Sequence, residues 1–374
     1  MINIFQPCLG QEELDRIRAV FKSNWIGKGN EVFEFERQFA VLLNTPPEHF
    51  TSTTCATEGL FLAAELFGLW NYDVIVPTVS FVAVGNAVLA AEANLILCDV
   101  DPHTLNVRAE DIRKKLTTST KAVYVTHYGG VPCNMDPILA LCRQRDIIII
   151  EDAACAPGAC YKGRACGTMG DMGVWSFDAM KILVTGDGGM IYLKDPDRIE
   201  RAKESLYLGL PGKSKSGIDL TGNDRWWEFD VNRPGRRAIM NDIAGAIGLA
   251  QLAKLPAFIN KRRAIEARYR DGLKDVAWLT LCPNVPESCT SSYYMFWVQT
   301  EHRDKLARHL LQHGIYTTFR YWPLHRIDFF KDDNPRTFPN AGYAAARTLN
   351  LPIHQSLKEE DVTKVIETIK SFPR

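Results

Sequence analysis

The sequence predicts an α/β protein in which helices cover both faces of a mostly parallel sheet, followed by a smaller α+β domain. Short apolar strands alternate with helical segments through the first half of the chain. These strands are continuous apolar runs, which is typical of strands buried on both faces. The 374 residues, 46% of them hydrophobic, can build two domains. We expect a large domain over residues 1–255 and a small one over 256–374.

The helical spacing of apolar residues predicts helices over 10–22 and 31–43, separated by a glycine-containing break. Strands are expected at 74–77, 95–100, 122–125 and 146–150, with helices at 81–91, 109–116 and 137–145 between them. A long helix over Asn241–Leu255 is expected to end at Pro256, because proline lacks an N–H and clashes with the preceding turn. A strand over Tyr293–Val298 belongs to the second domain.

Charge and cysteine content exclude several classes of function. Lys+Arg and Asp+Glu both number 44, so nothing indicates a nucleic-acid partner or a membrane surface. The ten cysteines lack metal-ligand spacing, so no metal site is expected and reduced thiols are favoured. The N-terminus has no signal-peptide pattern, and no apolar run reaches the ~18 residues of a membrane span. These features predict a cytoplasmic enzyme.

Two side chains indicate pyridoxal phosphate (PLP) chemistry. The apolar strand 147–150 ends in Glu151-Asp152, and Lys181 follows on a loop before the glycine-rich turn 185–189. A lysine amine can form a Schiff base with the PLP aldehyde, while a carboxylate keeps the pyridinium nitrogen protonated. The alternatives are a surface lysine and a helix-capping aspartate. A buried strand that delivers a carboxylate needs a positive partner, which favours the catalytic interpretation.

Several motifs in one order make the interpretation more specific. They are Ser-Phe-x-x-x-Lys at 176–181, Thr-Gly-x-Gly-Gly at 185–189, Glu-Asp-Ala-Ala at 151–154, Pro-x-x-Ser-Phe-x-Ala at 77–83, His-Tyr-Gly-Gly at 127–130, Gly-x-x-x-Gly-x-x-Gly at 163–170 and Pro-Leu-His at 323–325. Together they resemble the sugar aminotransferases of the DegT/DnrJ/StrS type, with the aspartate-aminotransferase-like PLP fold type I. The resemblance spans nearly the whole chain.

The resemblance implies PLP as the cofactor and a cofactor-binding role for several residues. Lys181 would be the Schiff-base lysine and the acid–base group, with Asp152 as the pyridinium partner. The turn at 54–60 opens a helix, and Ala56 and Thr57 would bind the cofactor phosphate there, as would the hydroxyl of Ser176. Phe81 would stack on the cofactor ring, although the residues alone allow it to be ordinary helix-face core.

Two positions depart from the family pattern. Cys155 stands where the family usually has Gln or His near the cofactor's phenolic oxygen, and a thiol is a much weaker hydrogen-bond donor. Arg237 stands where the family usually has an Asn that reaches the phosphate in the neighbouring subunit. An arginine there could bind the phosphate of the cofactor or of the substrate. It is equally consistent with the sequence that Arg237 is a solvated residue of a basic turn and binds no phosphate.

Other residues are candidates for substrate binding. Trp227, in the aromatic run 226–229, could stack on a nucleotide base or cover a sugar, and it fits a dimer interface or core equally well. Arg320, Tyr321 and His325 lie in the segment that faces the sugar in the family. Lys28, in the N-terminal glycine loop, would contribute across a subunit interface.

The leading expectation is an aminotransferase that moves an amino group from an amino acid, usually L-glutamate in the family, to a keto sugar that is nucleotide-linked. Such enzymes serve amino-sugar, polysaccharide or antibiotic biosynthesis, and the resemblance implies a homodimer with shared active sites. The enzyme alternative is a transaminase of a small phosphorylated ketone or a cyclitol. The remaining alternative is a non-catalytic, PLP-binding regulatory protein. The motif around Thr185 and Asp187 gives conflicting indications between amination at C3 and at C4.

Overall fold

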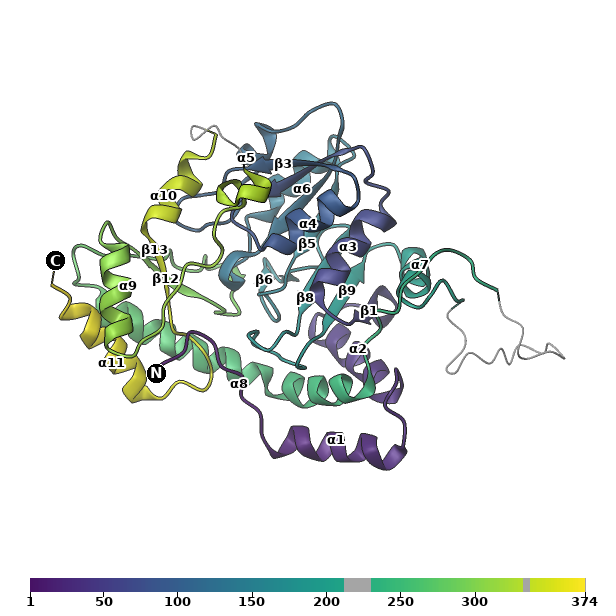
Figure 1. The fold of residues 1–374 in the computed structure, drawn as a ribbon, viewed down its shortest axis with the longest axis horizontal. Helices are drawn as coiled ribbons and strands as arrows, with labels where there is room; N and C mark the ends of the chain where they lie inside the picture. Colours follow the sequence, from purple (N-terminus) through teal and green to yellow (C-terminus); the bar gives the residue numbers. More distant parts are fainter. Residues whose placement is uncertain (212–229, 332–336, 374) are drawn as a thin grey trace.

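The computed structural model describes residues 1–211, 230–331 and 337–373. Its centre is a seven-stranded sheet in the order β1-β9-β8-β5-β4-β2-β3. The strands of this sheet are β1 (Phe50–Thr53), β2 (Asp73–Pro77), β3 (Asn94–Cys98), β4 (Thr120–Thr126), β5 (Ile148–Asp152), β8 (Met172–Ser176) and β9 (Gly189–Leu193). Figure 1 shows the sheet in the larger part of the molecule, with helices packed around it. The fold class expected from the sequence is confirmed.

The sheet is mainly parallel, and its parallel part forms the floor of the site. β3, β2, β4, β5 and β8 are paired in parallel, so their carboxyl ends lie along one edge. β9 pairs antiparallel with both β8 and β1. Because ligands of open α/β sheets bind outside the carboxyl ends of the strands, this edge is where a site is expected.

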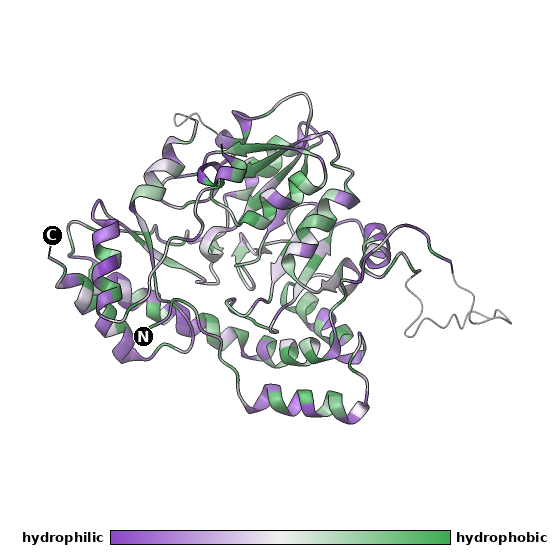
Figure 2. Cartoon of the chain, in the orientation of Figure 1, coloured by the Kyte–Doolittle hydropathy of each residue, from purple (hydrophilic) through white to green (hydrophobic). Residues whose placement is uncertain are grey.

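Helices α4 (Val82–Ala90), α5 (Ala109–Arg113) and α6 (Met135–Arg143) alternate with the strands β2 to β5, as the apolar spacing predicted. The other helices are α1 (Gln11–Ser23), α2 (Asn30–Leu42), α3 (Ala56–Leu66), α7 (Asp197–Leu206), α8 (Asp242–Leu273), α9 (Arg303–Gln312), α10 (Pro339–Arg347) and α11 (Glu359–Lys370). In Figure 2 most residues of the parallel strands are hydrophobic, while helix α1 carries both hydrophobic and hydrophilic residues. The apolar side chains of both element types form one continuous core.

Helix α8 corrects one expectation, since it runs through Pro256 to Leu273 instead of ending at the proline. Buried residues lie on both sides of the proline, among them Leu252, Leu255 and Phe258, and the helix packs against α1, α2 and α11. This packing outweighs the one missing hydrogen bond. By length and composition α8 could span a membrane, but 61% of its apolar window is buried inside the protein, as in a core helix. The division at 255/256 stays a prediction.

The C-terminal part is built on a second, antiparallel sheet of β10 (Thr280–Leu281), β12 (Phe296–Gln299) and β13 (Thr348–Leu351). A third small sheet joins β11 (Cys289–Thr290) to β6 (Cys160–Tyr161) and β7 (Arg164–Ala165). The N-terminus also packs here, because Ile2 pairs with Ile315 beyond α9. Figure 1 shows the N-terminal segment beside α9 and α11 before the chain crosses to α1.

Candidate active site

A cavity of about 480 Å³ opens at the carboxyl ends of β5 and β8. It gathers residues from the sheet, from the start of α3, from the loop after β8 and from the C-terminal part of the chain. The lining residues are Cys55, Ala56, Thr57, Leu60, Phe81, Ala83, Asp152, Ala154, Ser176, Asp178, Met180, Lys181, Asp187, Arg320 and Tyr321. The tertiary structure therefore brings together eight of the residues singled out from the sequence: Ala56, Thr57, Phe81, Asp152, Ser176, Lys181, Arg320 and Tyr321.

Lys181 stands at the centre of this group, on the loop that follows β8. Its Nζ lies 3.5 Å from Cys155 Sγ and 5.1 Å from the centroid of the Tyr294 ring. Asp178 and Thr185 fix the loop, because the Lys181 N–H donates to the Asp178 carbonyl and the Thr185 N–H donates to the Phe177 carbonyl. The amine is thus held at a defined place in the cavity wall.

The surroundings of Lys181 favour its charged form. Burial alone would lower the pKa of the ammonium, but Cys155, Tyr294 and Asp152 outweigh burial and raise this pKa. Cys155 and Tyr294 attract an ammonium only as anions, and burial raises the pKa of both groups. Among these three groups, Asp152 is the one whose ionised form is an ordinary carboxylate, and that form attracts the ammonium.

Asp152 ends β5 and is 5% exposed. Its Oδ1 accepts the Ala154 N–H at 3.1 Å, and its Oδ2 lies 3.5 Å from Thr126 Oγ1. Burial raises the pKa of Asp152 above its usual value, even though Lys181 and the Ala154 N–H act to lower it. A buried carboxylate with so few donors gains most from a cationic partner in the cavity, and a protonated pyridine nitrogen is such a partner.

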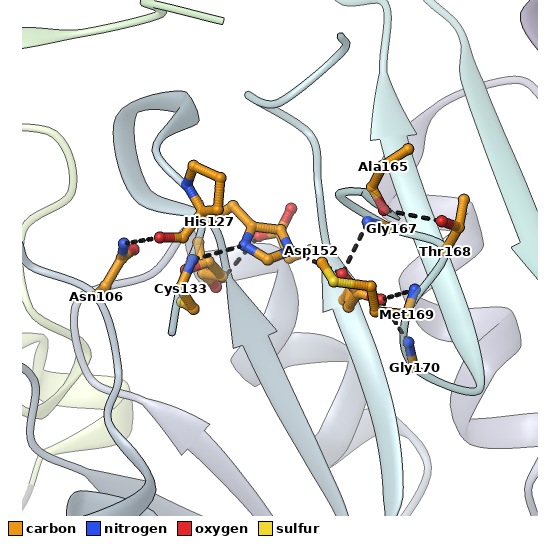
Figure 3. A network of polar contacts seen from close by, with 12 residues as sticks. Asn106, His127, Cys133, Asp152, Ala165, Gly167, Thr168, Met169 and Gly170 are labelled. Carbon is orange, nitrogen blue, oxygen red and sulfur yellow. Dashed lines mark hydrogen bonds and ion pairs between the residues drawn. The ribbon is translucent and has the colours of Figure 1, made fainter. Parts of the chain in front are cut away.

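The neighbouring Glu151 points to the other side of β5, because successive residues of a strand face opposite ways. There it binds the backbone of the loop before β8. Its Oε1 accepts the N–H groups of Met169 at 2.6 Å and Gly170 at 2.5 Å, and its Oε2 accepts the Gly167 N–H at 2.8 Å. His127 Nε2 lies 2.8 Å from the same Oε2. Figure 3 shows this network beside Asp152.

The network also determines which nitrogen of His127 carries the proton. The Cys133 N–H donates to His127 Nδ1 at 3.1 Å, so Nδ1 is an acceptor and Nε2–H donates to Glu151. The His127 N–H in turn donates to the Asp152 carbonyl at 3.1 Å. The buried Glu151–His127 pair therefore holds together the ends of β4 and β5, from which Asp152 projects.

Replacing Glu151 with glutamine is expected to reduce the free energy of unfolding by roughly 2–4 kcal/mol. The NH₂ group of the glutamine would face backbone N–H groups or His127 Nε2–H, so two hydrogen-bond donors would meet. If the His127 proton moved to Nδ1 instead, that N–H would meet the Cys133 N–H, which is also a donor. Urea denaturation followed by circular dichroism measures this loss. The exposed Glu48→Gln is the matched control, and equal stability of the two variants would contradict the anchoring role.

The start of helix α3 supplies an anion-binding end to the cavity. Cys55, Ala56 and Thr57 line the cavity where the first N–H groups of the helix lack intrahelical partners. The Ser176 hydroxyl lies in the same wall. A Cβ on Gly189 would stand 2.7 Å from the Ala56 nitrogen, so only glycine lets β9 pass this close to the turn. The arrangement fits a phosphate group.

The opposite walls are aromatic and basic. Phe81, the residue before α4, is 47% exposed, and its ring lies 5.5 Å from the ring of Tyr321. Arg320 Nη2 lies 3.2 Å from Met180 Sδ, and its guanidinium lies 4.8 Å from the centroid of the Phe5 ring. A flat aromatic ring bound between Asp152 and the α3 turn would therefore meet an aromatic face at Phe81.

Four other predicted site residues lie outside the cavity lining. Cys155 is buried behind Lys181, with its Sγ 3.5 Å from the Tyr321 hydroxyl. His325 Nδ1 lies 2.7 Å from Thr78 Oγ1, and its ring stacks on Phe338. Lys28 and Arg237 do not line the cavity either. Trp227 lies outside the described residues.

Lys28 and Arg237 both lie outside the cavity lining. Lys28 Nζ pairs with Glu36 at 2.7 Å and lines a separate cavity of about 380 Å³ beside α1. Arg237 is exposed, with its guanidinium 5.7 Å from the centroid of the Tyr207 ring. The Thr54 N–H donates to the Ala238 carbonyl, so the segment that carries Arg237 lies beside the turn that opens α3. The proposed roles of both residues stay predictions.

Other residues at the site were not predicted, although the sequence carries a signal for them. Glu151 ends the same buried strand as Asp152, and the need for a partner applied to both carboxylates. Tyr294 was visible only as part of a strand, yet its ring lies against Lys181. The cavity-lining Asp178 and Asp187 stand in the quoted motifs. Among the described residues, no group of three or more His, Cys, Asp or Glu side chains is placed to hold a metal ion.

Comparison with known proteins agrees with this geometry. The family model described as the DegT/DnrJ/EryC1/StrS aminotransferase family matches residues 7–370. The chain is 45% identical to the dTDP-4-dehydro-2,3,6-trideoxy-D-glucose 4-aminotransferase of Saccharopolyspora spinosa, over 98% of this chain and 95% of that protein. It is 32% identical to the GDP-perosamine synthase of Escherichia coli O157:H7, over 99% and 98% of the two chains.

A solved structure gives the same result. The aminotransferase TlmJ from Streptoalloteichus hindustanus superposes with a TM-score of 0.93 at 47% identity, over 99% of this chain and 98% of that one. The resemblance found from the motifs is confirmed over nearly the whole length. The chain belongs to the DegT/DnrJ/EryC1/StrS aminotransferase family.

Proposed function

We propose that this protein is a PLP-dependent aminotransferase that transfers the amino group of L-glutamate to C4 of a nucleotide-linked keto sugar. The observation that carries the proposal is the single cavity in which the Lys181 amine, the buried Asp152 carboxylate and the start of α3 meet. These three groups match an aldehyde, a pyridine nitrogen and a phosphate, which are three of the reactive or charged parts of PLP.

The residues of the cavity have different roles in catalysis and in cofactor binding. Bound PLP would supply an electron sink for the charge left when a proton is removed from the substrate carbon. Asp152 would stabilise positive charge on the pyridine nitrogen, which keeps that sink effective. Lys181 Nζ would remove the proton from the substrate carbon and return it, because Lys181 is the lysine that lines the cavity. Phe81 would cover one face of the ring, while Ala56, Thr57 and Ser176 would hold the phosphate.

The relatives support the choice of acceptor. The relative from Saccharopolyspora spinosa is named as a 4-aminotransferase of a dTDP-linked trideoxy keto sugar, and the one from Escherichia coli as a GDP-perosamine synthase. Both names refer to nucleotide-linked sugars with different nucleotides. The higher identity of the first relative favours a dTDP-linked acceptor and C4 for this chain.

A screen of dTDP-, UDP- and GDP-linked 4-keto and 3-keto sugars with L-glutamate tests the proposal, with products identified by mass. We expect an amino sugar and 2-oxoglutarate in equal amounts with at least one 4-keto sugar. Turnover of only a phosphorylated ketone or a cyclitol would favour the alternative transaminase. A PLP absorbance band that glutamate leaves unchanged would indicate a PLP-binding protein without activity.

Arg237 is proposed to bind a phosphate group, either of PLP or of the substrate. A guanidinium binds phosphate with two parallel hydrogen bonds, so Arg237→Ala is expected to weaken one ligand about 30-fold, or about 2 kcal/mol. Titration of PLP and of the nucleotide sugar shows which dissociation constant rises. Arg233→Ala, which removes an arginine paired with Glu204, is the control on the same segment. No change in either constant would leave Arg237 a solvated arginine.

The exposure of Arg237 leads to a proposal about assembly. We infer a homodimer in which Arg237 and Lys28 reach the site of the neighbouring subunit. Mixing Lys181→Ala subunits with Arg237→Ala subunits would then give heterodimers with one competent site. If subunits exchange but activity does not return, Arg237 does not act across the interface.

A further inference from the structure

A lysine, a thiol and a phenol form a continuous line of polar contacts at the edge of the cavity. Lys181 Nζ lies 3.5 Å from Cys155 Sγ, and Cys155 Sγ lies 3.5 Å from the Tyr321 hydroxyl. Lys181 and Tyr321 line the cavity, whereas Cys155 is buried behind them. The Tyr321 hydroxyl and the Lys181 amine are therefore linked through a single atom, Cys155 Sγ.

Only the first contact in this line has a fixed direction. An ammonium can only donate, so Lys181 donates to the sulfur. In the second contact either the Cys155 thiol or the Tyr321 hydroxyl can be the donor. No other hydrogen bond of the Tyr321 hydroxyl occurs among the residues that the structure describes. When the thiol donates, the Tyr321 O–H is left to donate into the cavity.

The backbone of Arg320, the residue before Tyr321, is held at both its N–H and its carbonyl. The Arg320 N–H donates to Asn350 Oδ1 at 2.7 Å, and the Tyr128 hydroxyl donates to the Arg320 carbonyl. The Tyr321 ring also packs against Phe81 at 5.5 Å and against the edge of Tyr128 at 6.5 Å. A donor held by packing on two sides loses little freedom when it binds a ligand.

The other ionisable groups near Lys181 are less suited to donate to a neutral or negative oxygen. Asp152, Asp178 and Asp187 are carboxyl groups, and Arg320 is directed toward Met180 and Phe5. Tyr294 lies against Lys181, but its hydroxyl is buried without a hydrogen bond and is not part of the lining. The Cys155 thiol is a weak donor. Burial raises the pKa of Tyr321 well above its usual value, so its hydroxyl keeps the proton.

We propose that the Tyr321 hydroxyl donates the hydrogen bond to the phenolic oxygen of PLP, and that the Cys155 thiol positions Tyr321 for this task. The inference rests on PLP binding as proposed above, and it is independent of which sugar is used. The phenolic oxygen of PLP lies on the ring carbon next to the aldehyde that reacts with Lys181, so a group beside the lysine amine is within reach. Tyr321 would thus donate the hydrogen bond to the phenolic oxygen, for which the Cys155 thiol is too weak a donor.

This hydrogen bond has a measurable consequence. A hydrogen bond donated to the phenolic oxygen stabilises its negative charge, and so reduces the attraction of that oxygen for a proton on the Lys181 nitrogen. Tyr321→Phe is therefore expected to raise the pKa of the Lys181 nitrogen in the PLP-loaded protein by about one unit. The pH titration of the visible absorbance measures this pKa without any substrate.

Three variants make the test specific. Cys155→Ala should raise the same pKa by less than Tyr321→Phe, because the phenol is present but no longer positioned by the thiol. Tyr294→Phe removes the other hydroxyl near Lys181 and should leave the pKa at the wild-type value.

An unchanged pKa in Tyr321→Phe, or a larger shift in Cys155→Ala than in Tyr321→Phe, would overturn the inference. A larger shift in Tyr294→Phe than in Tyr321→Phe would overturn it as well. A wild-type protein that shows no PLP band at all would instead refute the proposed function.

Discussion

Replacing Lys181 with alanine is expected to abolish transamination, with a loss of about 10⁴-fold or more, because general acid–base catalysis alone typically contributes 10²–10⁴-fold. Lys181 is the amine that lines the cavity, and it is the residue expected to bond covalently to PLP. Borohydride treatment of the PLP-loaded wild type, followed by peptide mass spectrometry, should place the cofactor on Lys181. The variant should yield no such peptide.

The control for this substitution is Lys194→Ala, an exposed lysine that follows β9. It should keep wild-type activity and the labelled Lys181 peptide. The Lys181 variant should still fold, because its side chain adds little packing, and a small primary amine should restore part of the proton transfer. Wild-type turnover by Lys181→Ala, at a normal unfolding temperature, would refute the assignment of the catalytic lysine.

Replacing Asp152 with asparagine is expected to lower kcat by about 10²–10³-fold, because the amide cannot hold positive charge on the cofactor ring. The same substitution should make the cofactor-free protein more stable at neutral pH. The pKa of Asp152 is raised in the folded state, so its folded form loses stability as the pH rises above the unfolded pKa, and the neutral amide removes this cost. Lower activity with higher stability is the expected signature of a residue kept for function.

Asp171→Asn is the matched control, since Asp171 precedes β8 and accepts the Ile149 N–H away from the cavity. That variant should lose stability and keep kcat per folded molecule. Steady-state kinetics at saturating PLP and urea denaturation of the cofactor-free protein separate the two effects. Near-normal kcat in Asp152→Asn would show that the carboxylate only caps the following turn.

The sequence determined the parallel sheet and the identity of the two central groups for local physical reasons. Continuous apolar runs are typical of strands that are buried on both faces. The strands β2, β3, β4 and β5 lie close to their predicted bounds. Asp152 was placed at the end of the predicted strand 146–150 and Lys181 on a loop before a glycine-rich turn, while the strand β8 before Lys181 was not predicted. The two residues were paired because PLP chemistry needs an amine and a carboxylate, and the structure shows that both line one cavity.

Only the tertiary structure decided the features that depend on long-range packing. Proline stops a helix when its local cost is all that matters, but α8 continues past Pro256 because apolar residues on both sides of it are buried. Glu151 and Asp152 look alike in the sequence, and the side of the strand on which each lies makes one an anchor and the other a cavity residue. Residues 155, 181 and 321 are far apart along the chain. Their line of contacts exists only because the C-terminal part folds over the sheet edge, and no local pattern records that contact.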